Sequence, residues 1–128
     1  MEAVLATRHT YLKTHSLSGS ALSFSLREEQ TALRERALAA RSGRAAKTLV
    51  KEGALRATLI ALRKGVALSP HRVDGSVSIH VLSGRARVFI DGAGSTVASG
   101  GLLVLGPDVT HSAEALANCV LLITVAMP

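Results

Sequence analysis

The stretch GVALSPHRVDGSVSIHVLSG, residues 65–84, decides the fold class that the sequence predicts. It opens on a short apolar run, bends at a proline, turns at Asp74-Gly75 and continues as a β-branched, alternating segment. Short runs of this kind, bounded by Gly, Pro and Asp, are typical of antiparallel strands joined by tight turns. The strands expected here and just after the Ser83-Gly84 turn are 66–68, 77–82 and 85–90.

A second stretch, GLLVLGPDVTH at residues 101–111, repeats this organisation. It predicts a strand over 102–105, a bend at Gly106-Pro107-Asp108 and another strand from about Thr110. Each stretch therefore places a histidine, His71 or His111, beside a proline-containing bend. We expect the two histidines to come together inside a β-barrel.

Together the two stretches resemble the motifs of the cupin superfamily, roughly G-x5-H-x-H-x3-E-x6-G and G-x5-P-x-G-x2-H. The matching residues are Gly65, His71, Gly84, Gly101, Pro107 and His111, with the step from proline to histidine one residue short. The resemblance covers roughly residues 47–128. It implies an all-β fold, a cupin-type antiparallel β-barrel (jelly roll) in a small single-domain cupin.

Two positions depart from the metal-binding form of these motifs. Val73 stands where such cupins have a second histidine, and Val77 stands where they have a glutamate. A divalent metal held by neutral imidazoles needs three or more protein ligands. The sequence thus predicts no tightly bound metal and no cofactor, and any metal present would be held by His71 and His111.

Other residues were considered as replacement ligands. Strand alternation puts Val77, Ile79 and Val81 on one face and Ser78, His80 and Leu82 on the other. If Val77 faces inward, His80 points outward. The remaining candidates are Asp74, Asp108 and Glu114, and Glu114 falls on the face opposite to His111.

The predicted function is binding of a small organic molecule in the barrel interior. The residues expected to line the site are His71, Val73, Val77, Ile79 and His111. Imidazoles titrate near neutral pH, so His71 and His111 are also the candidate catalytic acid and base of a metal-independent isomerase or cyclase. A weakly metallated oxygenase or isomerase is the remaining alternative.

Composition excludes several other classes. Aromatic residues make up 2% of the 128 residues, which argues against a base-stacking surface for single-stranded nucleic acid. The net charge is +6, and residues 1–64 carry 12 Lys and Arg against 5 Asp and Glu. No recognition motif accompanies this basic half, so we expect a solvated surface and no nucleic-acid partner.

A single cysteine, Cys119, lies in an apolar run and is expected to be a small buried residue. One cysteine forms no internal disulfide and fits a reducing compartment, which predicts a cytoplasmic protein. No run of roughly 18 apolar residues is present, so no membrane association is expected.

Before the barrel, the sequence predicts an extended arm over residues 1–24 and a surface helix within 25–43. Ser25 and Glu28 have capping-box form, and strong helix formers continue to Arg41 before Gly43. The barrel then occupies 44–128. We expect a homodimer in which the arm covers a sheet edge of the partner subunit.

Overall fold

The computed structural model describes residues 17–128, and within that range one helix precedes nine strands. The elements are α2 (Leu26–Ala39), β1 (Arg44–Glu52), β2 (Leu55–Leu62), β3 (Ala67–His71), β4 (Ser76–Ser83), β5 (Arg85–Ile90), β6 (Ala93–Ala98), β7 (Leu102–Leu105), β8 (His111–Ala115) and β9 (Cys119–Ala126). Two of the predicted strands differ clearly at their ends: β3 continues past the predicted 66–68 to His71 itself, and β4 is one residue longer at each end than the predicted 77–82. The bend at Pro70 therefore lies inside a strand, as a local irregularity in its pairing.

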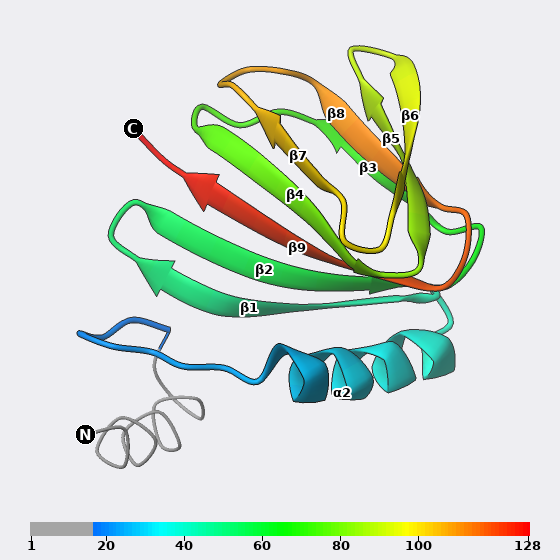
Figure 1. The fold of residues 1–128 in the computed structure, drawn as a ribbon, viewed down its shortest axis with the longest axis horizontal. Coiled ribbons are helices and arrows are strands. Elements are labelled where there is room, and N and C mark those ends of the chain that lie inside the picture. The colour runs from blue at the N-terminus through cyan, green and yellow to red at the C-terminus, as the bar shows by residue number, and fades with distance from the viewer. Residues whose placement is uncertain (1–16) are drawn as a thin grey trace.

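The strands form two antiparallel sheets that face each other (Figure 1). The larger sheet has the order β1-β2-β9-β4-β7, and the smaller has the order β3-β8-β5-β6. Consecutive strands thus often lie in different sheets, as in a jelly roll. The expected all-β, antiparallel architecture with one helix before it is confirmed.

The space between the sheets is filled by aliphatic side chains. Val77, Ile79 and Val81 of β4 are all at most 3% exposed, while the intervening residues are half-buried on the other face. Val88 of β5 and Leu121 of β9 are fully buried against them. The predicted alternation along this strand is therefore confirmed, and Val77 belongs to the inner core.

Helix α2 covers the outer face of the larger sheet, below β1 and β2 in Figure 1. Leu33 and Ala37 are its buried residues, and they pack in a second apolar cluster with Leu49, Leu59, Ala61 and Val120. The helix ends at Ala39, two residues before the predicted end. Leu38, expected near the apolar stripe, is 48% exposed.

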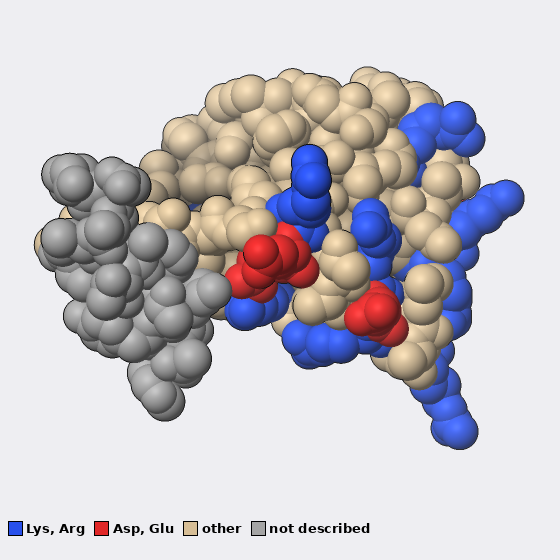
Figure 2. Space-filling model, turned by 60° about the horizontal axis from the view of Figure 1, so that its bottom comes forward, with Lys and Arg blue, Asp and Glu red and all other residues tan. Residues whose placement is uncertain are grey.

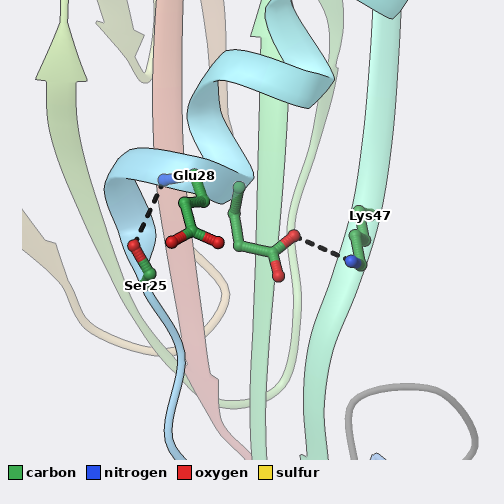
Figure 3. A network of polar contacts seen from close by, with 4 residues as sticks. Ser25, Glu28 and Lys47 are labelled. Carbon is green, nitrogen blue, oxygen red and sulfur yellow. Dashed lines mark hydrogen bonds and ion pairs between the residues drawn. The ribbon is translucent and has the colours of Figure 1, made fainter. Parts of the chain in front are cut away.

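The side of the molecule that carries α2 is rich in basic residues, with a few acids among them (Figure 2). One acid forms an ion pair that ties the helix to the sheet, because Glu29 Oε1 lies 2.7 Å from Lys47 Nζ of β1. At the start of the helix, Ser25 Oγ accepts a hydrogen bond of 3.3 Å from the backbone N–H of Glu28 (Figure 3). The predicted N-terminal cap is therefore present.

The described part of the arm, residues 17–24, lies against the end of β1 in its own chain. The Lys51 N–H donates to the Leu17 carbonyl at 2.8 Å, and the Gly19 N–H donates to Glu52 Oε1 at 2.7 Å. Residues 1–16 of the predicted arm lie outside the described residues. Exchange of the arm with a partner subunit stays a prediction.

Candidate functional site

The two histidines meet where β3 ends and β8 begins. His71 is paired directly with His111 across the two antiparallel strands. Their ring centroids lie 4.4 Å apart with an interplanar angle of 58°. The structure thus brings together the two residues that the sequence singled out, although they are 40 positions apart in the chain.

In both imidazoles, Nδ1 is the nitrogen that forms a hydrogen bond with a backbone carbonyl. His71 Nδ1 lies 3.2 Å from the Ser69 carbonyl, and His111 Nδ1 lies 3.0 Å from the Val109 carbonyl. A carbonyl oxygen only accepts hydrogen bonds, so each Nδ1 carries the proton and donates it. In the neutral form of both rings, Nε2 is then a bare acceptor.

The two rings differ in burial. His71 is exposed, whereas His111 is 4% exposed, and His111 is the one buried polar or charged residue among those described. Its Nε2 is also the only buried side-chain nitrogen or oxygen without a hydrogen-bond partner in residues 17–128. An unpartnered buried acceptor costs about 1–3 kcal/mol. This atom is the clearest chemical feature of the site.

A small, partly enclosed cavity of about 10 Å³ adjoins both rings. Its walls are aliphatic apart from the histidines and one serine: Leu68, His71, Ile79, His111, Ser112, Ala113, Leu121 and Ile123. A volume of this size holds about one water molecule. On the outer side, His111 also borders an open hollow of about 410 Å³ with Pro70 and Phe89 in its wall.

Not all predicted lining residues reach the cavity. Ile79 lines it as expected, but Val77 and Val73 pack elsewhere in the inner core and are absent from its walls. Five lining residues were not predicted from the sequence: Leu68, Ser112, Ala113, Leu121 and Ile123. Alternation from His111 and Cys119 along their strands would have indicated Ala113, Leu121 and Ile123.

The candidate replacement ligands do not converge on the histidines. Asp74 and Asp108 are exposed, and Glu114 lies on the face of β8 opposite to His111. Within residues 17–128, no group of three or more His, Cys, Asp or Glu is placed to hold a metal. The donor set at this point is two imidazoles, which does not fit a tightly held divalent ion.

Cys119 lies in the inner core at the beginning of β9 and is fully buried. Burial raises the pKa of its thiol to about 11, because the thiolate would lose its hydration. A protonated, buried thiol is a poor nucleophile. The residue has the structural role that the sequence predicted.

No protein-family model matches the chain, and the search of curated proteins found no match. Solved structures do match. A conserved protein of unknown function from Streptococcus pyogenes is 28% identical, with a TM-score of 0.65 over 70% of this chain and 78% of that one. A cupin superfamily protein from Desulfitobacterium hafniense is 14% identical, with a TM-score of 0.64 over 66% of this chain and 78% of that one.

A salicylate 1,2-dioxygenase from Pseudaminobacter salicylatoxidans is 20% identical, with a TM-score of 0.74 over 86% of this chain and 36% of the enzyme. These structural matches establish the fold of this chain and not its chemistry. No helix among the described residues is long and apolar enough to cross a membrane. From its two facing antiparallel sheets, its paired motif histidines and these structural neighbours, the described chain has the fold of a small cupin domain.

Proposed function

We propose that this cupin binds a small organic molecule at His71 and His111, without a tightly bound metal. The observation that carries the proposal is the buried, unpartnered Nε2 of His111. Its other nitrogen is committed to the backbone, so a ligand that donates a hydrogen bond to Nε2 would offset the cost of burying it. Ligands with a hydroxyl, an enol or a carboxylic acid group on a compact apolar body have this chemistry.

The cavity of about 10 Å³ is too small for such a molecule, so binding requires β3 to move. This strand is an edge of the smaller sheet and pairs only with β8. Its register is irregular between Leu68 and His71, where Pro70 has no N–H to donate. A modest outward displacement of β3 would join the cavity to the hollow beside His111.

Acid–base catalysis by the same pair is the second candidate function. The two imidazoles are in ring contact, each is held by Nδ1, and both line the same small cavity. Nε2 of one neutral ring could take a proton from an acidic C–H beside a carbonyl, and the resulting imidazolium could return that proton to a neighbouring carbon of the substrate, which leaves the ring neutral again. This reaction is a metal-independent isomerisation, and it needs the same opening of β3.

Side-chain NMR of the histidine rings tests the binding proposal. Phenol and glycolic acid are the probes, added to uniformly ¹⁵N-labelled protein. We expect the His111 Nε2 resonance to move saturably with at least one probe, while His80 on the outer face of β4 stays unchanged. Equal shifts at His80, or none at either motif histidine with both probes, would overturn the proposal.

Metal content of the tag-free protein tests the second half of the proposal. We expect far less than one iron, zinc, nickel or manganese per chain, and no rise in thermal stability when these ions are added. Near-stoichiometric metal that is lost in His71→Ala and His111→Ala would overturn the metal-free assignment. It would favour a weakly metallated oxygenase or isomerase instead.

We also propose that the protein acts in the cytoplasm, because a single cysteine fits a reducing compartment. We propose further that it is a homodimer, because the edge strand β7 is apolar and exposed. Leu102 and Val104 of β7 are 59% and 69% exposed, and an uncovered apolar edge invites pairing. The molecular mass in solution, with and without residues 1–20, tests this arrangement. A dimer that survives the deletion would sink exchange of the arm, and a monomeric full-length chain would sink the dimer.

A further inference from the structure

A second hollow, the groove, lies over β1 and β2, and Leu68 of β3 completes its lining. It has a volume of about 340 Å³ and is lined by Ser42, Arg44, Ala45, Ala46, Ile60 and Leu68. Volumes of this size are typical of sites for small molecules. Neither histidine lines the groove, and Leu68 is the one lining residue that it shares with the cavity at the histidines, so the two spaces are distinct.

The groove lies beside β1, where Leu68 is the one residue of the smaller sheet in the lining. Arg44 pairs with Leu62, and Ala46 pairs with Ile60. Leu62 and Ile60 belong to or pack on the inner core, and directly opposed residues share a face, so Arg44 and Ala46 also lie on the inner side of the sheet. Ala46 is nevertheless exposed, which leaves an apolar floor open to solvent.

Arg44 stands at one end of this floor with its charge uncompensated. Among the described residues its guanidinium has no hydrogen-bond or ion-pair partner, and no acidic side chain lines the groove. Arg63 is a second cationic residue next to this end of β1. Its backbone N–H donates a hydrogen bond of 2.8 Å to the carbonyl of Gly43, the residue before Arg44. Figure 2 shows Lys and Arg gathered at the end of the molecule where α2 finishes.

These features select the chemistry of an occupant. A guanidinium presents a planar fork that matches a carboxylate, and one free arginine balances one negative charge. The aliphatic floor and wall favour an apolar body attached to that carboxylate. We propose that the groove between β1, β2 and β3 binds a monocarboxylate with an apolar tail, its carboxylate on Arg44 and its tail over Ala46 and Ile60. This site is additional to the histidine site of the proposed function.

Octanoate is the probe, followed by backbone and methyl NMR of the full chain. We expect saturable shifts at Ala46, Ile60 and Leu68. We further expect Arg44→Gln to weaken octanoate binding by about tenfold or more, since the substitution removes a charge-assisted, bidentate pairing with the carboxylate. 1-Octanol, which has the same tail and no charge, should bind the unaltered protein more weakly by a similar factor.

The matched control is Arg56→Gln, an exposed arginine on β2 near the other end of the same hairpin, which should bind octanoate as the unaltered protein does. Equal affinity of Arg44→Gln and the unaltered protein would overturn the proposal. So would shifts scattered away from the groove, or groove resonances that move with protein concentration alone, which would indicate a second copy of the chain as the occupant. In His111→Ala, loss of the phenol response with octanoate shifts retained would separate this site from the histidine site.

Discussion

The two faces of the larger sheet are built differently. The outer face is closed by α2, where Leu33 and Ala37 meet an apolar surface and leave no described polar side chain buried. The inner face is covered by the smaller sheet only in part. Between the two sheets, His111 of β8 is buried with an unpartnered nitrogen, and an open apolar groove lies beside β1. We infer that the outer face serves stability, while the inner face gives up some packing for binding.

The largest effect is expected from breaking the outer cluster. Leu59 of β2 is fully buried between α2 and the sheet. Leu59→Ala removes that side chain and leaves a cavity, so we expect a loss of about 3 kcal/mol in the free energy of unfolding. Urea denaturation measures it. The control is Leu55→Ala on the same strand, where 45% exposure predicts a far smaller loss; similar losses for the two variants would contradict the comparison.

The reactivity of Cys119 tests whether the inner core is closed to solvent at the beginning of β9. With its pKa raised from 9.0 to about 11, the thiolate fraction at pH 8 is about 100-fold lower than in the unfolded chain. Alkylation by iodoacetamide should slow at least by that factor in the native protein and recover in urea. Rapid native alkylation would mean that this end of the sandwich opens.

The same pKa predicts the direction of a pH effect on stability. The unfolded thiol ionises from about pH 9, while the buried thiol stays protonated until about pH 11. The contribution of Cys119 to stability is therefore complete below pH 9 and declines as the pH rises toward 11. In Cys119→Ala this part of the decline should disappear from urea titrations across that range.

The turn residues made much of the fold predictable. Asp91-Gly92, a dipeptide typical of hairpin turns, joins β5 to β6; both residues have positive φ, and Ile90 pairs with Ala93. Gly84 has φ of +79°, and a Cβ there would collide with the Asn118 carbonyl oxygen. Such local backbone requirements can be recognised directly in the sequence, and the strand boundaries predicted near them were correct to within one residue.

The candidate site was predictable only in part. Motif spacing placed His71 and His111 together, but it could not show that Val77 packs away from them, because this depends on how the two sheets meet. The groove at Arg44 was missed for a related reason. Nothing in the sequence indicates that the smaller sheet stops short of β1, so a run of small residues such as Ala45-Ala46 predicts nothing by itself.

A smaller effect on stability is expected from replacing His111, the buried polar residue between the two sheets. His111→Leu eliminates the unpartnered Nε2 but also the hydrogen bond to the Val109 carbonyl, so the two changes oppose each other. We expect unfolding free energy to change by no more than about 1 kcal/mol, with the response to phenol abolished. His80→Leu on the outer face of β4 is the control, because His80 lines neither the cavity nor the hollow beside His111 and should keep the response to phenol. A loss as large as that of Leu59→Ala would show that His111 is needed for the fold.

The smallest effect on stability is expected from the ion pair at the edge of the outer cluster. Lys47 is 43% exposed and Glu29 is 13% exposed, so their 2.7 Å pair is partly screened by solvent. Lys47→Ala should cost about 0.5 kcal/mol, and the cost should shrink further in 1 M salt, whereas the loss in Leu59→Ala should persist there. Urea denaturation at both salt concentrations measures this difference. A salt-insensitive loss would mean that the aliphatic stem of Lys47 packs on α2, and the outer cluster would then extend to its rim.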